Sequence, residues 1–411
     1  MNMKKIATFI GVLIGLVVLF MAGRYVWESQ TQTDTGQDGL RTELTEEEQE
    51  QKTEELTATL HRVNRYADSV GIDTSRFALG PEPTLAETRT KLARLLLEVR
   101  YGKKPSRLAF SGLKETVDSA WASNANAGFT DQMRQQVASF GPYNQLVGHY
   151  NRLRQSAKTN PAVADSLRLI RQSLNFYRYT NRFAGDQFVL VNIPAGELNV
   201  FDRSGRRLLP MQVIAGKADK RTPCMTTYIK NIVAYPYWNV PKGIAVKEML
   251  PKIQRDLAFI YNQNLEILDE RERVVSPEDV DWESLSEDNF PYRIRQASGC
   301  ENALGLIKFD LENPLAIYLH DTNGRDMFTL TNDRWRSHGC VRVQKPVELA
   351  NFVLGKPTFD KDFMNRCLID QKPQTLPMSK PFPVFIAYNT ADIDSTGRLR
   401  FYEDVYGLDK Q

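Results

Sequence analysis

The hydrophobic period of this 411-residue chain changes at Gly185, and that change constrains the fold more than any other feature. Before it, apolar residues from Leu56 to Val70 recur three and four positions apart, which is the spacing of one face of a helix. After it, short apolar runs such as residues 188–193 alternate with turn residues, as strands do. We therefore predict an α+β protein, with an all-α scaffold domain over residues 56–183 and a β-rich domain over residues 184–411.

Residues 242–292 interrupt the strand pattern of the second domain. Val246–Leu250 and Ile253–Ile260 have helical spacing, and an acidic stretch follows from Glu266 to Asp288. We expect an inserted helical subdomain here, which would serve as a lid.

An apolar segment lies at the amino terminus. Residues 6–23 carry no charge and follow Lys4 and Lys5, and as a helix they would span about 27 Å, close to the thickness of a bilayer core. A cleavable signal peptide has a shorter apolar region and a clearer cleavage site, so we favour an uncleaved anchor over residues 1–27, with a buried core helix as a further alternative. The two lysines predict a cytoplasmic amino terminus, with the bulk of the chain on the other side of the membrane.

Charge is segregated along the sequence. The net charge of +3 combines −8 over residues 28–55 with +10 over residues 56–183, while residues 184–411 are nearly neutral. The acidic segment reads as a linker, and the charge blocks indicate modules with different surroundings. No nucleic-acid-binding signature occurs, so a nucleic-acid partner is not expected.

A cysteine and a histidine offer the clearest chemistry. Cys340 follows Gly339, and His320 lies twenty positions earlier at the end of a predicted strand. A thiol becomes a nucleophile when a nearby imidazole takes its proton, and the turn at Gly339 would present free N–H groups as an oxyanion hole. The alternative is a buried, inert cysteine. Zinc binding is disfavoured because neither a fourth ligand nor a second motif is visible.

The string Ser337-His338-Gly339-Cys340-Val341-Arg342, with His320 upstream, closely resembles the active-site signature of the YkuD-type L,D-transpeptidases, which cross-link peptidoglycan. The resemblance to their large, scaffold-bearing (YcbB-like) branch covers residues 184–411, and it implies a β-sandwich catalytic domain. It rests on five further segments, which are residues 191–198, 235–241, 302–305, 318–321 and 402–407.

By this resemblance, Cys340 is the acyl-accepting nucleophile and His320 the general base. The backbone carbonyl of Asp321 would orient the imidazole, whatever its own side chain. The remaining implied residues fall in two groups: loop support from Ser337, His338 and Gly339, with the N–H groups of Gly339 and Cys340 as oxyanion donors; and a substrate-binding set of Tyr318, Trp335 and Arg342. Arg342 could equally form a structural salt bridge, and Tyr318, Trp335 and Ser337 could be packing or capping residues. No cofactor or metal is implied.

The implied activity is a membrane-anchored, periplasmic transpeptidase. It would form 3→3 cross-links through a thioester, taking a donor tetrapeptide stem, releasing terminal D-alanine and passing the acyl group to an amine acceptor. Carbapenem acylation of Cys340 is also implied. Two alternatives stay open: a carboxypeptidase or hydrolase of the same fold, and a wall-binding tether without catalysis.

The sequence departs from the family pattern in two ways. Residues 151–166 are too few to hold the small peptidoglycan-binding module that many members of the branch carry. Cysteine is also unexpected at Cys224 and Cys300, which we expect either to be incidental or to form a mutual disulfide, while Cys367 reads as a core residue.

Overall fold

The computed structural model describes residues 44–123, 140–157, 160, 163–368 and 371–409. The predicted anchor and most of the predicted linker lie outside these residues. Among the described helices, none is both long and apolar enough to cross a membrane. Residues 55–411 form one compact unit.

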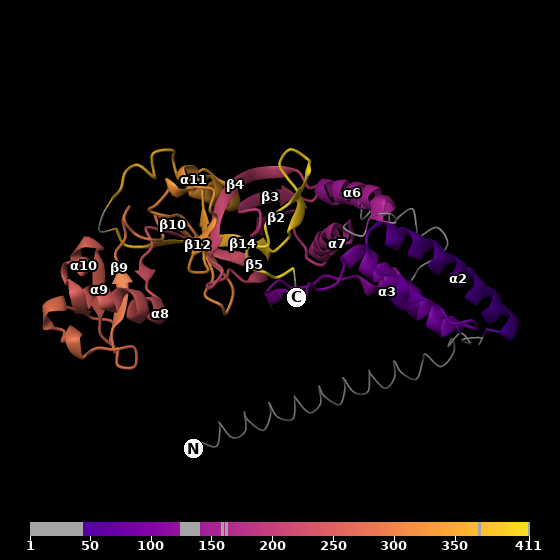
Figure 1. The fold of residues 1–411 in the computed structure, drawn as a ribbon, viewed down its shortest axis with the longest axis horizontal. Helices are drawn as coiled ribbons and strands as arrows, with labels where there is room; N and C mark the ends of the chain where they lie inside the picture. Colours follow the sequence, from indigo (N-terminus) through magenta and orange to yellow (C-terminus); the bar gives the residue numbers. More distant parts are fainter. Residues whose placement is uncertain (1–43, 124–139, 158–159, 161–162, 369–370, 410–411) are drawn as a thin grey trace, which may run out of the picture. The chain divides into compact units, whose positions relative to one another are not determined.

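The helical part follows the predicted apolar spacing. Each long helix buries one stripe of its surface; in α7, Leu167, Ile170, Leu174 and Tyr177 are buried. The helices are α2 (Glu46–Ser69), η1 (Ser75–Phe77), α3 (Leu85–Tyr101), α4 (Ser119–Ser123), α6 (Gly141–Ala157) and α7 (Val163–Thr180) (Figure 1). Helix α2 begins inside the predicted linker. The sequence also predicts a short helix around Met133–Phe140, and most of these residues lie outside the described part of the chain.

The prediction of an all-α scaffold is wrong at one place. Residues Leu108–Ser111 form strand β1, which pairs in parallel with β5 (Cys224–Ala234) of the second domain. The Gly112 N–H continues the attachment by donating to the Thr226 carbonyl at 2.7 Å. A four-residue strand of this kind depends on a partner more than a hundred residues away, so its own sequence gives little signal.

The β-rich domain is built on a ten-stranded sheet. Its strand order is β1-β5-β10-β11-β13-β4-β3-β2-β14, with β12 pairing β4; because β14 also pairs with β5, the pairings close into a ring. Its remaining strands are β2 (Gln187–Asn192), β3 (Glu197–Asp202), β4 (Arg207–Gly216), β10 (Ile307–Leu311), β11 (Leu319–His320), β12 (Trp335–Ser337), β13 (Val341–Val343) and β14 (Gln374–Ala387). Helices α11 (Met327–Leu330) and α12 (Pro346–Leu354) and a separate hairpin, β15 (Ala391–Ile393) with β16 (Leu399–Phe401), complete this part.

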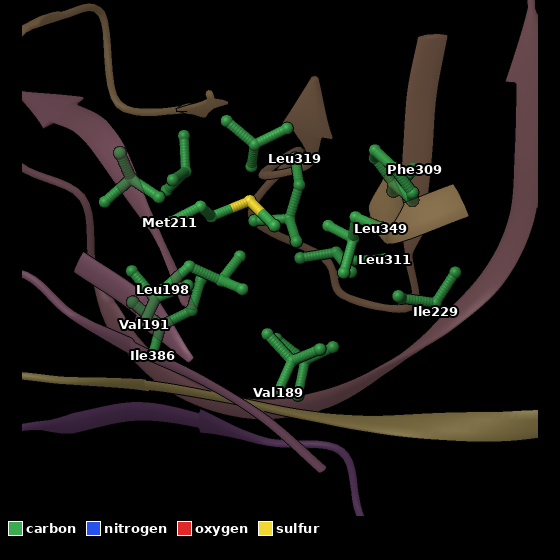
Figure 2. Close-up of a cluster of buried hydrophobic side chains, with 14 of the residues drawn as sticks. Val189, Val191, Leu198, Met211, Ile229, Phe309, Leu311, Leu319, Leu349 and Ile386 are labelled. Atoms are coloured by element: carbon green, nitrogen blue, oxygen red, sulfur yellow. The ribbon is translucent and has the colours of Figure 1, made fainter. Parts of the chain in front are cut away.

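Strand β2 separates two hydrophobic cores. Val189 and Val191 point into the core enclosed by the strands, shown in Figure 2 with Leu319 and Leu349. The alternate residues Phe188 and Leu190 belong to a different core, shared with the helices of the scaffold part. Both faces of β2 are therefore covered, which explains why its sequence is a nearly continuous apolar run rather than an alternating one.

The predicted insert has its own core. Helices form where the apolar spacing predicted them, but the insert is not purely helical, because a sheet accompanies them. Helices α8 (Lys242–Ile244), α9 (Leu250–Arg255) and α10 (Ala258–Asn262), with a π-helical turn at Ala245–Met249, accompany a four-stranded sheet (Figure 1). The sheet comprises β6 (Trp238–Asn239), β7 (Leu265–Leu268), β8 (Val274–Val275) and β9 (Arg293–Gln296), and short 3-10 turns cover Pro277–Asp279 and Trp282–Ser284. Strand β8 and most of β7 lie in the acidic stretch Glu266–Asp288, whose composition does not indicate strands.

The cysteine pairing also differs from the prediction. Cys300 forms a disulfide with Cys367, with Cα atoms 5.2 Å apart, so Cys367 is not a core residue. Cys224 is free and buried at the start of β5, where burial raises the pKa of its thiol to about 12. The disulfide joins the segment after the insert to the segment after α12.

Candidate active site

Two neighbouring strands bring the predicted cysteine and histidine together. Strands β11 and β13 are parallel, with His320 opposite Arg342, and the Val341 N–H donates to the Tyr318 carbonyl at 3.1 Å. Because successive side chains of a strand point to opposite faces, Tyr318 and His320 share one face with Cys340 and Arg342. Cys340 is thus diagonal to His320 across adjacent strands.

Cations flank the histidine on both sides. His320 pairs with Lys308 on β10 and with Arg342 on β13, so the three side chains form a row across the sheet. Lys308 also lies 4.6 Å from the centroid of the Tyr318 ring and forms an ion pair with Asp310 at 2.7 Å. Sequence reasoning missed Lys308, because its place beside His320 follows from strand pairing.

His320 is held in its neutral form. Its side chain is only 5% exposed, and burial, reinforced by the positive charges of Arg342 and Lys308, lowers its pKa to about 3. The nearby backbone groups of Asp321 and Leu304 act in the opposite direction and raise the pKa of His320 slightly. Among the described residues, Nδ1 of His320 is buried without a hydrogen-bond partner. The Tyr318 ring packs against the imidazole at a centroid distance of 5.6 Å. A neutral imidazole can accept a proton.

The thiol of Cys340 is held in its protonated form. Burial raises its pKa, although hydrogen bonds from the backbone and the hydroxyl of Tyr318 oppose the shift. The Sγ atom lies 3.6 Å from the Ala316 carbonyl, to which the thiol donates. The residue is partly exposed. The Cys340 thiol therefore carries the proton, and the neutral imidazole of His320 is the group on the same face that can accept it.

The loop before the cysteine corrects one predicted role. Gly339 has φ +120°, and its N–H donates to Ser337 Oγ at 3.1 Å, so this N–H is already engaged and is not a free oxyanion donor. The Ser337 hydroxyl donates in turn to the Cys340 carbonyl at 2.5 Å. Thr222 fixes the loop from outside by donating to the Gly339 carbonyl at 2.7 Å, a contact that the sequence did not reveal. The Cys340 N–H remains as the donor beside the thiol.

His338 connects the loop to the insert. Its Nε2 lies 2.9 and 3.0 Å from the two carboxylate oxygens of Glu248, which also receives a hydrogen bond from Lys220 at 2.5 Å. These contacts, that of Lys220 most strongly, lower the pKa of Glu248. Trp238, in β6 just before residues 242–292, is near the Tyr318 hydroxyl and opposes the rise of its pKa that burial causes. The insert itself contacts His338, beside the cysteine, through Glu248.

The Asp321 side chain matters more than predicted. It is fully buried, accepts from the Leu306 N–H at 2.8 Å and pairs with Arg325 at 2.7 and 3.1 Å. A side chain at Gly305 (φ +63°) would collide with this carboxylate, since an added Cβ would lie 2.1 Å from Oδ2. Asp321 therefore fixes the end of the strand that carries His320, through its side chain as well as its backbone.

Arg342 lacks an acidic partner among the described residues, whereas Trp335 is hydrogen-bonded and packed in the core. Within the described chain Arg342 makes no ion pair; its Nε is buried without a hydrogen bond and its Nη1 lies 3.6 Å from Met327 Sδ. The predicted alternative of a structural salt bridge is therefore not observed. Trp335 instead donates from Nε1 to the Ile193 carbonyl at 2.9 Å and packs on the core of the sheet, as a structural residue does. The described residues contain no group of His, Cys, Asp and Glu side chains suited to hold a metal ion.

The chain is similar in part of its length to known L,D-transpeptidases. Residues 186–379 match the family model of the YkuD L,D-transpeptidase catalytic domain. A putative L,D-transpeptidase of Haemophilus influenzae is 40% identical over 223 residues, which are 54% of this chain and 45% of that protein, so the match spans about half the length of the relative. Solved structures include the catalytic domain of an Enterococcus faecium L,D-transpeptidase (12% identity, TM-score 0.24, 50% of this chain and 99% of that one). Another is an L,D-transpeptidase from Mycobacterium smegmatis (12%, TM-score 0.21, 50% and 60%).

Proposed function

We propose that the whole chain is a peptidoglycan L,D-transpeptidase with Cys340 as nucleophile and His320 as base, because residues 186–379 match the family model of the YkuD L,D-transpeptidase catalytic domain. The observation that carries the proposal is that Cys340 lies diagonal to His320 on one face of two paired strands. A protonated thiol and a neutral, buried imidazole share one face of the sheet, which is the starting state that nucleophilic catalysis requires.

The first half-reaction cleaves the donor. His320 takes the thiol proton, and Cys340 Sγ attacks the carbonyl of the third residue of a tetrapeptide stem. The Cys340 N–H stabilises the oxyanion of the tetrahedral intermediate. When the intermediate collapses, the bond to the terminal D-alanine breaks, and His320 returns the proton to the leaving amine. A thioester on Cys340 and free D-alanine result.

The second half-reaction forms the cross-link. The side-chain amine of another stem attacks the thioester carbonyl, His320 accepts a proton from that amine, and the thiolate leaves and is reprotonated. The product carries a 3→3 link between two stems. Arg342, which has a guanidinium without an acidic partner on the same face as Cys340, is suited to hold a carboxylate of the donor or the acceptor.

The insert is assigned the role of a lid. Transfer to an amine competes with attack by water, so the thioester must be shielded until the acceptor binds. The contact of Glu248 with His338 supports this role, because it ties the insert to the loop that carries Cys340. Deletion of residues 242–292 should lower the ratio of cross-linked to hydrolysed product; an unchanged ratio would exclude the lid.

The arrangement of the whole chain is proposed on the same basis. Residues 1–27 would anchor it in the inner membrane and residues 28–55 would form the linker. Residues 56–183 would be the scaffold of the large, YcbB-like branch, and residues 184–411 the periplasmic catalytic domain with its lid at about 242–292. Urea extraction of membranes tests the anchor: the chain should stay with the membrane, and its release would refute an integral segment.

The proposed activity is tested by incubating the full chain, in mild detergent, with purified disaccharide-tetrapeptides and weighing the products. Cross-linked dimers are expected, with loss of one D-alanine for each dimer. Tripeptide monomers alone would indicate the carboxypeptidase instead, and unchanged substrate would favour the wall tether. Carbapenem acylation, which the family suggests, should add the mass of one drug molecule to the wild type and none to Cys340→Ala.

A further inference from the structure

A cavity lies between the scaffold part and the β-rich domain, with none of the candidate catalytic residues in its lining. It has a volume of about 410 Å³ and is lined by α7, by the segment from α3 to β1 and by the end of β14. A volume of this size is enough for a small ligand or a short piece of peptide. The helical part and the catalytic sheet therefore enclose a site of their own.

The lining of this cavity is strongly basic. Seven of its side chains are arginine or lysine, whereas Asp73 and Glu98 are the acidic ones. Glu98 pairs with Arg76 at 2.7 Å, and Arg107 pairs with Asp409 at 2.8 Å. Lys103 and Arg168 make longer ion pairs, with Glu98 at 3.9 Å and with Asp165 at 3.5 Å. The remaining three basic side chains have no ion pair among the described residues, so the cavity has a net positive charge suited to an anion.

Helix α7 directs a stripe of polar side chains into the cavity. Arg168, Arg171, Asn175 and Arg178 are spaced by three, four and three residues, which places them on one side of the helix, and all four line the cavity. Arg171 and Arg178 make no ion pair within the described residues; each instead hydrogen-bonds a tyrosine hydroxyl, Arg171 at 3.1 Å and Arg178 at 3.3 Å.

Arg178 is the strongest indication of a missing partner. It is 2% exposed, its Nη1 donates to the Val70 carbonyl at 2.8 Å, and its Nε is buried with no hydrogen bond. A guanidinium that is removed from water without a carboxylate carries a large desolvation penalty, which a bound anion would offset. This residue therefore marks the cavity as an anion site.

The opposite wall is held in place before any ligand arrives. The backbone N–H and carbonyl of Lys103 both hydrogen-bond the Asn175 side chain, at 2.8 and 2.9 Å. Gly102, at φ +56°, lets this segment approach α7, because an added Cβ would lie 2.7 Å from the Asn175 carbonyl. Lys104, the next residue, is exposed at the cavity and forms no ion pair in the described chain.

Apolar residues complete the lining. Ile72, Leu108, Phe176 and Ile386 accompany the cations, so the ligand should carry apolar groups between its acidic ones. We propose that the cavity is a second binding site for peptidoglycan stem peptides, which are held by their carboxylates away from the catalytic thiol. This inference rests on the proposed function and assigns wall recognition to the scaffold part.

Binding is to be measured on the full chain carrying Cys340→Ala, with disaccharide-tetrapeptide as the probe and inorganic phosphate as the comparison. Hydrogen-exchange mass spectrometry should show protection of residues 102–108 on addition of the muropeptide. In the same background Lys104→Glu should weaken that response about fivefold or more, since it replaces a charge-assisted contact by repulsion. Lys114→Glu is the matched control, because Lys114 is an exposed lysine of the same part of the chain outside the cavity.

Protection that depends on Lys104 but not on Lys114 supports the proposal. Protection confined to residues 337–342, equal responses of the two variants, or a response at residues 102–108 to phosphate alone would overturn it. The wild-type product assay separates the two proposals. If dimers form while the cavity fails to bind, only the second site is refuted, whereas binding without any turnover would refute the transpeptidase and leave the site standing.

Discussion

The buried histidine makes a prediction about acid stability that is independent of catalysis. His320 has a pKa of about 3 in the folded chain, against an ordinary value of about 6.5 in the unfolded chain. As the pH falls below about 6.5, the unfolded chain binds a proton at this residue while the folded chain does not. Stability is therefore lost progressively from about pH 6.5 down to about pH 3.

The size of the effect follows from the same two values. At pH 5 the unfolded histidine is almost fully protonated and the folded one almost fully neutral, so the residue lowers the free energy of unfolding by about 2 kcal/mol relative to pH 7.5. Other buried groups titrate in this range, including Asp392, whose pKa burial raises to about 6. A comparison of variants is needed to isolate the contribution of His320.

The measurement is urea unfolding of the wild type and of His320→Gln at pH 7.5 and pH 5. The difference in unfolding free energy between the two proteins should shift by about 2 kcal/mol in favour of the variant at the lower pH. His61→Gln, at an exposed position of α2, serves as the control and should follow the wild type. If His320→Gln ran parallel to the wild type, the imidazole would not be buried in its neutral form, and the low pKa assigned to it would be wrong.

Three further predictions concern the lid, the substrate and the disulfide. Glu248→Gln removes the ion pair between the insert and His338, which is about one-third exposed and worth about 1 kcal/mol or less. The ratio of cross-linking to hydrolysis should therefore fall up to about fivefold. Glu287→Gln, which breaks the exposed pair with Lys247, is the control, and an equal response of the two variants would exclude a role of the Glu248–His338 contact in the lid. Arg342→Gln should raise KM for the donor about tenfold, measured by D-alanine release, while Arg336→Gln, at an exposed neighbour, should not; equal KM values would remove Arg342 from the substrate site. Cys300→Ser should lower the free energy of unfolding by about 4 kcal/mol, because the disulfide closes a span of 67 residues; an unchanged urea midpoint would contradict this.

Much of the architecture was predictable because it depends on local periodicity. The apolar stripe of α7 predicts a helix and the apolar run at residues 188–193 predicts a strand, because each pattern arises from burial within a single element. The insert was visible because it breaks the strand rhythm. Its small sheet was not, because its strands are only two to four residues long and several of their side chains are charged.

The features that sequence reasoning missed all depend on partners distant in the chain. Strand β1 exists through its pairing with β5, and Cys300 meets Cys367 rather than Cys224 because folding places their Cα atoms 5.2 Å apart. Lys308 and Glu248 lie at the candidate site through strand register and through the packing of the insert. The cysteine and histidine were identifiable because their motif is specific, whereas the groups that tune their protonation were not.

The central claim is that Cys340 carries the acyl group. It is tested most directly by rapid acid quenching of the full chain with disaccharide-tetrapeptide, followed by peptide mapping. The account predicts a tripeptide-linked thioester on the peptide that contains Cys340, together with one free D-alanine for each adduct, and neither product from Cys340→Ala. Cross-linked dimers formed by the Cys340→Ala chain would contradict it.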